Sequence, residues 1–555
     1  MPADDENEEK PKENNSGNAR SILSNFASST TAHGCSQINQ SQSSVAKCVW
    51  LLIFIGCTIG AIICITALLQ KYFAFPTKDV IVLKTGAIAA PSISVCSLNP
   101  IPSSFRTRLS GIAPDNKVNT VLRALDLASE RVANTSFGLH EKLSESYLRL
   151  NSYIWIYENA PGENETLQFA HELDDLVVSC MYQGIPCDKS TVKIFTNPYF
   201  YKCYTFNAMD YNDTYNGPFI HSTGTKSGIS MLFFLDTHDS GETLYNPYCP
   251  LGGNTGVRVV IHQPGTIPDP FNDGFDVAPG YSTNVGITKR KRELLGRPWG
   301  DCERREKLDD GLPFLYDRRS CKLLCLQAFV AERCGCVTSY LPISENMKNI
   351  TRCGQMDLEN FNSASPNLTT LEHELDRLSC ELKSVYVILD DQDDVDCDCP
   401  QSCERDIYDY TLSQSEWPSG GVQLHFYRHI AHLKGEAYFN SSMYHLLDDK
   451  VNTNDSMVNM KNQRMIQQNF LRVNTFFTSM DTEIVKQVEE YPFTDMISGV
   501  GGGFGVYVGF SIVTMCEFCV LFVHLLRAMI MDREKRKVKS AELHSSKVIP
   551  TKTAW

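Results

Sequence analysis

The chain has 555 residues, of which 42% are hydrophobic and 21% charged, and its formal net charge is -14. This composition excludes collagen, a long coiled coil and a wholly disordered chain. The mean hydropathy of -0.22 does not exclude membrane spans, because two apolar segments of ordinary length would be diluted about tenfold by the other residues.

The N-terminal part begins with a polar tail and continues with a long apolar segment. Residues 1–47 are first acidic and then rich in Ser and Asn, so we predict a mostly disordered tail. No charged residue occurs from Cys48 to Leu69, and a helix of that length crosses a hydrocarbon core of roughly 30 Å. We therefore predict a membrane helix over residues 48–70. A cleaved signal peptide is the alternative, but its apolar core is usually shorter, about 7–15 residues.

The central segment, residues 71–495, predicts one large folded domain of mixed α and β structure. Alternating apolar residues predict strands at 152–157, 256–262 and 423–427, and helical spacing predicts helices at 138–150, 320–334 and 369–385. We find no internal repeat and no long low-complexity stretch in this segment, so we expect a single multi-lobed domain.

The central segment holds 15 of the 21 cysteines. Clusters at 321–325, 334–336 and 397–403 would suit a zinc ion in a reducing compartment. We predict disulfides instead, because the membrane orientation derived below places the segment outside the cell, and no histidine stands at zinc-finger spacing. Since fifteen is odd, at least one cysteine should be unpaired or joined to another chain.

Seven Asn-x-Ser/Thr sequons in the central segment agree with exposure to the secretory lumen. Tripeptides this short also occur by chance, so they support the topology only weakly. The predicted glycosylation sites are Asn134, Asn164, Asn212, Asn349, Asn367, Asn440 and Asn454.

The second apolar segment, residues 496–526, is too long for one straight helix across a membrane. Only Glu517 and His524 interrupt its 31 residues, which as a helix would measure about 46 Å. Six glycines are concentrated at 499–511, where they lower the cost of a break and allow close helix packing. We expect the segment to bend, tilt or unwind there, at a place that lines water or is covered by protein.

The charges beside the spans predict the orientation in the lipid bilayer. The C-terminal tail, residues 527–555, carries eight Lys or Arg against three Asp or Glu, and basic residues favour the cytosolic side. Both tails are therefore predicted to be cytosolic, and the central segment extracellular, in a two-span protein of the plasma membrane. The central segment then carries a net charge of about -17.

The sequence contains no motif that would indicate an enzyme, a resident cofactor or a metal centre. His171 and Asp174 could bind a metal ion, and the acidic segment 390–398 could bind Ca²⁺, but a polar helix face and a solvated acidic surface are the simpler interpretations. The basic residues 289–292 could form a protease site, an anion contact or an exposed loop. An acidic extracellular domain gives no reason to expect a nucleic-acid partner.

We place the function in the membrane spans. Two spans cannot enclose a wide aqueous pore, so several copies would have to assemble around one axis. At the break, backbone carbonyls can replace part of the hydration shell of an ion, and Glu517 would add a ring of carboxylates. A structural hydrogen bond at a helix interface is the alternative role for Glu517. A two-span adhesion or receptor subunit without a pore is the alternative class of protein.

Several motifs together resemble the family of degenerins, epithelial sodium channels and acid-sensing channels, from residue 26 to the end of the second span. They are FASSTTAHG (26–34), APSISVCSLNP (90–100), HELDDLVVSC (171–180), YKCYTFN (201–207), GFDVAPG (274–280), RPWGDC (297–302), the cysteine string from Cys321 to Cys403, and GFS (509–511). The resemblance implies an α+β membrane protein with two transmembrane helices, a disulfide-rich extracellular domain and a homotrimeric, amiloride-sensitive sodium channel.

The resemblance also implies roles for residues in the pore. The selectivity filter for the permeant Na⁺ would be the Gly-x-Ser motif formed by Gly509, Phe510 and Ser511. The lower pore, below the filter, would be lined by the re-entrant motif and by an intramembrane acid, namely His33, Gly34 and Glu517.

Above the filter, the resemblance implies a pore mouth and a wrist that couples the extracellular domain to the pore. The mouth would contain Asp495, Ser498 and Gly499, and the wrist would pair Phe75 with Trp299. Many relatives have an Asp directly before the Gly-Gly pair of the mouth, and this chain does not. We therefore expect extracellular Ca²⁺ and amiloride to bind at this mouth differently than in those relatives.

The family's disulfide pattern, carried onto this sequence, accounts for fourteen of the fifteen cysteines and leaves Cys249 over. The implied pairs are Cys96–Cys203, Cys180–Cys187, Cys302–Cys403, Cys321–Cys399, Cys325–Cys397, Cys334–Cys380 and Cys336–Cys353.

The gating stimulus is the least determined part of the resemblance. Acid-sensing members carry a His pair where this chain has Pro76 and Thr77, which disfavours proton gating. We favour opening by an extracellular FMRFamide-type neuropeptide, because an amidated, cationic ligand would be attracted to a domain of about -17. Acid-sensing, constitutive epithelial and mechanosensitive channels are the alternatives. The candidate ligand contacts, for which core packing is the alternative, are Tyr153, Trp155, Tyr157 and Glu158.

Overall fold

The computed structural model divides the chain into two compact units. The helical unit comprises residues 1–78 and 488–555, and the central unit comprises residues 79–487. The structure describes residues 19–32, 34–100, 102, 170–210, 217–236, 254–308, 311–355, 373–374, 376–381, 383–384, 397–434 and 465–545.

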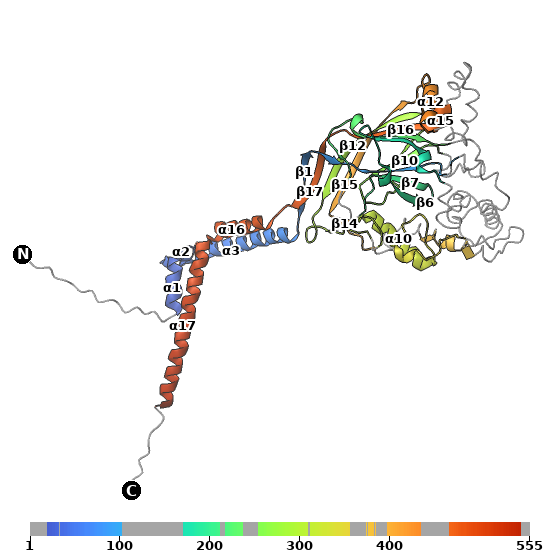
Figure 1. Cartoon of the computed structure of the whole chain (residues 1–555). Coiled ribbons are helices and arrows are strands. Elements are labelled where there is room, and N and C mark those ends of the chain that lie inside the picture. Colours follow the sequence, from blue (N-terminus) through green and yellow to red (C-terminus); the bar gives the residue numbers. More distant parts are fainter. Residues whose placement is uncertain are drawn as a thin grey trace, which may run out of the picture. The chain divides into compact units, whose positions relative to one another are not determined.

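The helical unit contains two helices that are long and apolar enough to cross a membrane, judged by length and composition: α3 and the Ile512–Met531 part of α17. The predicted first span, 48–70, lies inside α3. The predicted second span is divided between α16 and α17, which Figure 1 shows running in different directions. The helices of this unit are α1 (Ala19–Ser29), α2 (Cys35–Gln40), α3 (Ser44–Phe73), α16 (Phe493–Val508) and α17 (Ile512–Ser545).

Most of the glycines in 499–511 lie inside helix α16 and do not break it. Gly499 and Gly503 lie one turn apart and face α3, where an added Cβ would meet Leu68 and Cys64 respectively. On α3 itself, a Cβ on Gly60 would lie 3.0 Å from the ring of Tyr507. The two helices therefore pack closely along a face of small residues, as membrane helices often do. Only the last of the six glycines ends the helix.

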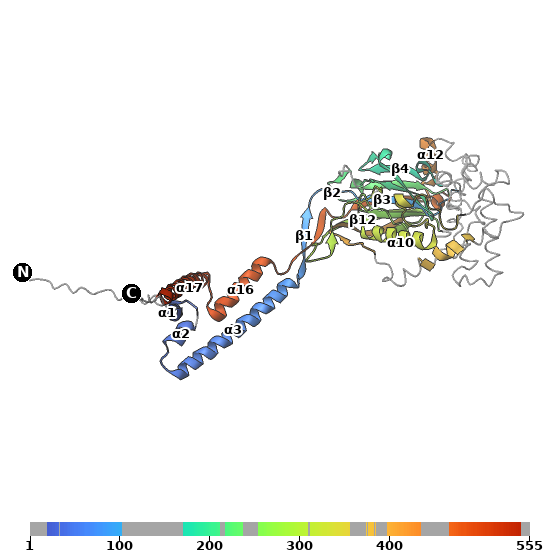
Figure 2. The same cartoon turned by 90° about the horizontal axis from the view of Figure 1, so that it is seen from below.

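The N-terminal tail is more structured than its composition predicts. Residues 19–29 and 35–40 are helical, and α1 contacts α17 while α2 contacts α3, as Figure 2 shows. Phe26 of α1 packs edge-on against Phe518 of α17, with ring centroids 4.9 Å apart. The prediction of disorder is wrong for these residues, because helices with few charges gain stability from tertiary packing that composition alone does not reveal.

The central unit is built on two antiparallel or mixed sheets. The larger has eight strands in the order β1-β17-β12-β16-β9-β4-β5, with β15 paired to β12, and the smaller has the order β11-β10-β3-β7-β6. The strands of the larger sheet are β1 (Thr77–Thr85), β4 (Val177–Tyr182), β5 (Ile185–Pro186), β9 (Ile229–Phe234), β12 (Tyr281–Glu293), β15 (Glu404–Glu416), β16 (Phe470–Phe477) and β17 (Asp481–Glu489). Those of the smaller sheet are β3 (Ser92–Ser97), β6 (Lys193–Asn197), β7 (Tyr201–Phe206), β10 (Val257–His262) and β11 (Phe275–Val277).

The main hydrophobic core of the central unit draws on both sheets. Val95 and Val259 come from the smaller sheet, and Phe233 and Val473 from the larger, and all four are fully buried. In β16 the side chains alternate between buried and half-buried positions, which is the pattern of a strand with one face on a core. The short elements around the sheets are β2 (Ile88–Ala89), β8 (Phe219–Ile220), β13 (Cys302–Glu303), β14 (Gln401–Ser402), α9 (Leu173–Leu176), α12 (Gln423–Lys434) and α15 (Met465–Asn469).

Seven disulfides tie the central unit together, and they are the same pairs that the family resemblance implies. Helix α10 (Arg318–Cys334) carries Cys321 and Cys325 one turn apart, and both bond to the segment before β14. The full set is Cys96–Cys203, Cys180–Cys187, Cys302–Cys403, Cys321–Cys399, Cys325–Cys397, Cys334–Cys380 and Cys336–Cys353. Cys249 lies outside the described residues.

The predicted elements of the central segment have mixed outcomes. The strand at 256–262 and the helix at 320–334 are confirmed as β10 and α10, and the described residues between 373 and 384 are helical. The predicted helix at 138–150 and strand at 152–157 lie outside the described residues.

The predicted strand at 423–427 is wrong, because these residues begin helix α12. Among the residues of α12 whose burial is described, Gln423, Tyr427 and Ile430 are buried, and their spacing of four and three is helical. A five-residue window shows alternation by chance and misses this longer pattern.

Candidate ion pathway

The helical structure of the second apolar segment is interrupted at the predicted filter motif. Helix α16 ends at Val508, and Gly509 adopts the left-handed conformation with φ 66° and ψ 26°. The amides of Gly509 and Phe510 donate back to the carbonyls of Gly505 and Phe504, at 3.0 and 3.2 Å. This is the arrangement of a glycine cap at a helix C-terminus, where a residue with a Cβ would be strained.

The helix resumes at once through a reciprocal pair of side-chain caps. Ser511 Oγ accepts from the amide of Thr514 at 3.3 Å, and Thr514 Oγ1 accepts from the amide of Ser511 at 3.2 Å. Thr514 Oγ1 also lies 3.4 Å from the carbonyl oxygen of Gly509. The pattern is a capping box with Thr in place of the usual Glu. The two ends of the break are thus linked through one fully buried threonine hydroxyl.

The segment before Gly34 contacts this site from the other side. Thr31 Oγ1 lies 2.7 Å from Thr514 Oγ1. Glu517 Oε2 accepts from Thr30 Oγ1 at 2.9 Å and from the amide of Thr31 at 3.0 Å. These contacts match the structural hydrogen bond considered as the alternative role of Glu517.

The side chain of Phe510, the middle residue of the predicted filter, packs into a row of aromatic rings. Phe510 lies between Phe504 and Phe518, at centroid distances of 5.7 and 5.9 Å, and Phe26 continues the row beyond Phe518. The contacts of this ring are therefore packing contacts with the neighbouring rings. The polar groups that Phe510 can offer to an ion are therefore its backbone atoms.

The predicted re-entrant motif is described in part. Gly34 precedes α2 with φ 87°, a conformation that favours glycine, whereas His33 lies outside the described residues. A Cβ on Gly34 would lie 3.4 Å from the ring of Phe54 in α3. The turn at Gly34 therefore directs the chain from the Thr30–Thr31 contacts back toward the first apolar helix.

The predicted mouth residues lie in the first turns of α16. Asp495 and Ser498 are exposed, and Asp495 occupies the first turn of the helix, where a negative charge is favourable. Gly499 faces α3, and a Cβ there would come within 2.9 Å of the Tyr491 hydroxyl. Lys71 lies 3.4 Å from Glu490 and stacks over the ring of Tyr491 at 5.2 Å.

The two predicted wrist residues belong to different units. Phe75 follows α3 with φ 48° and lies 6.0 Å from the ring of Tyr72. Trp299 lies in the central unit, in the turn before β13, and is half-exposed. Their pairing stays a prediction.

The candidate metal ligands of the central unit are engaged in structural contacts. His171 is buried and its Nε2 lies 3.1 Å from the carbonyl oxygen of Asn99. Asp174 pairs with Lys189, whose hydrogen bond lowers the pKa of that carboxyl. Among the residues that the structure describes, no three His, Cys, Asp or Glu side chains gather around a common point.

The basic residues 289–292 lie on strand β12 and not in an exposed loop. Lys289 is 2.6 Å from Asp406 of β15, and both side chains are largely buried. Lys291 is 2.8 Å from Glu404, and this hydrogen bond lowers the pKa of Glu404. Arg290 likewise lies 3.4 Å from Asp409 of β15, so cross-strand ion pairs explain why three adjacent cations are tolerated in this strand.

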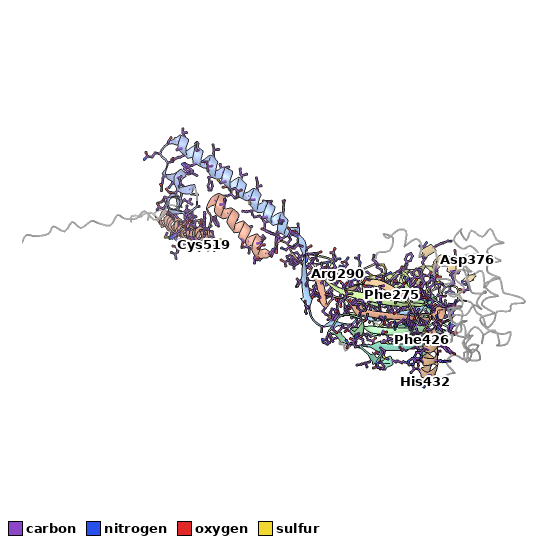
Figure 3. The ribbon with its side chains drawn as sticks, turned by 90° about the horizontal axis from the view of Figure 1, so that it is seen from above. Phe275, Arg290, Asp376, Phe426, His432 and Cys519 are labelled. Carbon is purple, nitrogen blue, oxygen red and sulfur yellow. A yellow bond between two sulfur atoms is a disulfide. The ribbon has the colours of Figure 1, made fainter. Side chains whose placement is uncertain are left out.

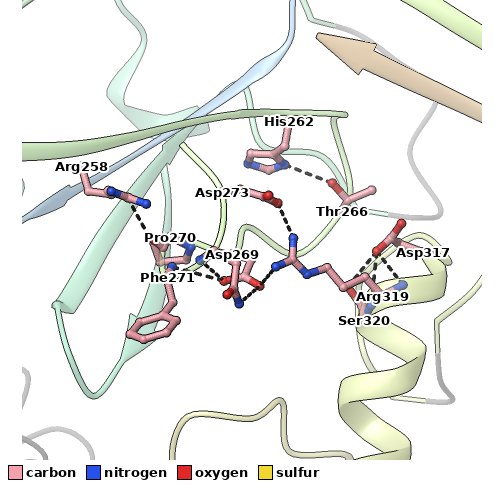
Figure 4. A network of polar contacts seen from close by, with 11 residues as sticks. Arg258, His262, Thr266, Asp269, Pro270, Phe271, Asp273, Asp317, Arg319 and Ser320 are labelled. Carbon is pink, nitrogen blue, oxygen red and sulfur yellow. Dashed lines mark hydrogen bonds and ion pairs between the residues drawn. The ribbon is translucent and has the colours of Figure 1, made fainter. Parts of the chain in front are cut away.

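A large cavity, of about 1180 Å³, lies in the central unit between the smaller sheet and α10. Arg319 of α10 spans its edge, 2.8 Å from Asp269 and 2.7 Å from Asp273, as Figure 4 shows. His262 also lines the cavity, and burial lowers its pKa to about 4, so it remains neutral near pH 7. Asp269 and Asp273 are thus already paired with Arg319 of the same chain.

Several predicted residues fall outside the described part of the chain. These include all four candidate peptide contacts, Tyr153, Trp155, Tyr157 and Glu158, and the sequons at Asn134, Asn164, Asn212, Asn367, Asn440 and Asn454. The remaining sequon residue, Asn349, is described and exposed, as a glycosylation site requires.

Sequence reasoning missed the threonines of the break. The available signal was the Ser-x-x-Thr spacing of Ser511 and Thr514 at the start of an apolar helix, which is a capping pattern. No local signal identified Thr30 and Thr31, because their contacts with Thr514 and Glu517 join residues more than 480 positions apart.

Comparison with known proteins places the chain in a family. It matches the amiloride-sensitive sodium channel family over residues 26–521, which is most of its length. The chain therefore belongs to this family of ion channels, which are not enzymes, and it is a sodium channel by that membership.

Named relatives show how the family varies. The chain is 26% identical to the FMRFamide-activated amiloride-sensitive sodium channel of Cornu aspersum over 552 residues, covering 93% of this chain and 84% of that protein. It is 25% identical to acid-sensing ion channel 1 of Gallus gallus over 534 residues, covering 92% and 85%. It is 24% identical to degenerin deg-1 of Caenorhabditis elegans over 384 residues, covering 68% and 42%. The names of these relatives do not share one stimulus. Family membership therefore identifies a sodium channel but not the stimulus that opens it.

Proposed function

We propose that three copies of this chain form a Na⁺-selective, amiloride-sensitive channel of the plasma membrane that an extracellular FMRFamide-type peptide opens. The observation that carries the pore is the capped break at Gly509–Ser511 within an apolar segment. A break in a membrane helix needs polar partners, and here they come from Ser511, Thr514 and the N-terminal segment. Such a site can hold backbone oxygens at fixed positions facing an ion.

Selectivity would follow from a narrow ring of small residues. Gly509 adds no side chain, Phe510 turns its ring into the aromatic row, and Ser511 is exposed. Three copies around one axis would place three sets of carbonyl and hydroxyl oxygens at one level, replacing part of the hydration shell of Na⁺. The fixed geometry would come from Thr514.

The proposed orientation has both tails in the cytosol and the central unit outside. The supporting observation is the basic cluster in the last part of α17, which follows the apolar Ile512–Met531 part. The seven disulfides of the central unit and the free cysteines described in the helical unit agree with an oxidising exterior.

Peptide gating is supported by similarity and by charge. The FMRFamide-activated channel of Cornu aspersum matches nearly the whole chain. A central segment of about -17 would attract a cationic, amidated peptide and speed its association. Binding would then favour the open state through a higher affinity for it.

Proton gating is the second candidate, and one buried carboxyl favours it. Glu381 is only 1% exposed, and burial raises its pKa to about 7, although the nearby hydroxyls of Thr338 and Tyr340 oppose the shift. A group that titrates near neutral pH could report acidification. Against this candidate, Pro76 and Thr77 stand where acid-sensing relatives carry a His pair.

The decisive experiment is a panel of amidated peptides applied at constant pH to cells that express the full chain. We expect Na⁺ currents that amiloride blocks and that start with FMRFamide-type peptides. Robust acid currents with silence to every peptide would replace peptide gating by proton gating. No Na⁺ current under peptide, acid or stretch would reject the homomeric channel.

The filter is tested separately with a bulkier residue. Ser511→Leu should reduce the current or the preference for Na⁺ over K⁺, measured from the reversal potential. Ser44→Leu, at the exposed start of α3, serves as the matched control. Unchanged selectivity in Ser511→Leu would count against this placement.

A further inference from the structure

Helix α12 carries three histidines within eight residues. His425, His429 and His432 are separated by four and three positions, so they share one face of the helix. All three side chains are exposed. No role for them follows from the pore, from the disulfides or from the core.

The opposite face of α12 is fixed against the domain. Its buried residues Gln423, Tyr427 and Ile430, with 2%, 4% and 2% exposure, precede the histidines by two positions, a rotation of about 200°. Phe426 packs against Trp417 and Phe470 at 4.9 and 5.1 Å. The helix cannot rotate without breaking this packing, so the histidine face is held toward solvent. Figure 3 shows His432 at the margin of the domain and Phe426 nearer its interior.

Two imidazoles one helical turn apart can bind the same metal ion. Their Cβ atoms lie about 5–6 Å apart in an α-helix, and ring nitrogens bind Zn²⁺ at about 2.0–2.1 Å. Imidazole suits Zn²⁺, Cu²⁺ and Ni²⁺, whereas Ca²⁺ and Mg²⁺ prefer oxygen ligands. The chemistry therefore selects a divalent transition-metal ion.

We propose that α12 forms a surface site for such an ion, centred on His429. This residue can share the ion with His425, one turn before it, or with His432, one turn after it. His425 and His432 lie too far apart along the helix, about 10 Å, to form a pair of their own. Because no third protein ligand is gathered there among the described residues, water completes the coordination.

The surrounding charges set the strength of the site. Arg428 is exposed beside the histidines, about 60° around the helix from His425, and its charge opposes a bound cation. The acidic central segment attracts cations from solution. We therefore expect a moderate affinity for the ion, and removing the charge of Arg428 should raise it.

The test is Zn²⁺ binding to the purified full-length protein, measured by calorimetry. His429→Ala removes both pairs and should weaken binding by at least about tenfold, whereas His425→Ala and His432→Ala each leave one pair and should weaken it less. His221→Ala, another exposed histidine of the central unit, is the matched control. Arg428→Gln should strengthen binding.

The outcomes separate the proposal from the channel hypothesis, because binding is measured without any current. Protection of the α12 histidines from chemical modification by Zn²⁺, lost in His429→Ala, would support the site. Equal affinity in the wild type and His429→Ala, or an equal loss in His221→Ala, would overturn it. These residues are exposed, so their replacement should leave the fold intact, and the thermal unfolding of each variant checks this directly.

Discussion

Irregular backbone is stabilised by different bonds in the helical unit and in the central unit. In the central unit, seven covalent bonds fix loops and short elements around two sheets. In the helical unit the described cysteines are free, and the one break in the apolar helix is held by hydroxyl and carboxylate hydrogen bonds. Covalent bonds suit a scaffold, whereas hydrogen bonds can be exchanged when a pore changes state.

The comparison predicts that removing cysteines destabilises the central unit strongly and the helical unit little. This is the largest effect that we expect. The pair Cys302–Cys403 closes a sequence separation of 101, so its replacement by alanines should cost the central unit about 3–5 kcal/mol. Thermal unfolding and delivery to the cell surface measure this loss. The matched control replaces Cys516 and Cys519, which are free. Similar losses in both variants would contradict the division.

Glu381 offers a pH-dependent test inside the central unit. Its pKa is raised from 4.5 to about 7, so the folded state holds a proton that the unfolded state releases, and stability falls as pH rises from about 4.5 through 7. Above pH 7 the full penalty is about 3 kcal/mol. Glu381→Gln should therefore raise the melting temperature at pH 8, with the advantage disappearing near pH 4.

The control for Glu381 is Glu332→Gln on the exposed face of α10, which should leave the pH profile unchanged. A wild-type and a Glu381→Gln protein with parallel melting curves from pH 4 to 8 would show that this carboxyl does not titrate in that range.

In the helical unit, the buried hydroxyl of Thr514 is the most informative target. Thr514→Val keeps the shape but removes the acceptor for the Ser511 amide, at a cost of about 1–2 kcal/mol. If that geometry sets selectivity, the Na⁺ to K⁺ permeability ratio should fall by roughly tenfold. Thr58→Val, which removes only a bond within one helix, is the control. An unchanged permeability ratio would show that the capping hydrogen bonds of Thr514 do not determine the selectivity.

The smallest expected effect concerns the ion pairs at the cavity of the central unit. Arg319 is 41% exposed and bridges Asp269 and Asp273, so Arg319→Ala should cost less than about 1 kcal/mol, and less again at high salt. Melting temperatures at low and high salt measure the difference. A loss comparable with that of the disulfide variant would show that these pairs, and not the covalent bonds, hold α10 in place.

The sequence by itself determined the features that depend on composition and on short, regular spacing. The uninterrupted apolar run from Cys48 to Leu69 defines a helix that α3 contains, and the excess length of the second run requires it to bend, tilt or unwind. The alternation of residues 256–262 and the helical spacing of 320–334 identify β10 and α10. These signals are local, because hydrophobic period and hydrogen-bond pattern are set within a few residues.

Only the tertiary structure decided how the break is held and which surfaces are free. Five of the six glycines that suggested a break stay helical, and two of them, Gly499 and Gly503, pack against α3. Three of the four cations of β12, Lys289, Arg290 and Lys291, are paired across strands. Residues 423–427 begin a helix whose half-buried Phe426 meets Trp417 and Phe470. Thr31 and Thr514 meet from opposite ends of the chain. Contacts between distant residues leave no periodic trace in a sequence, so the physical environment of each group becomes known only from the fold.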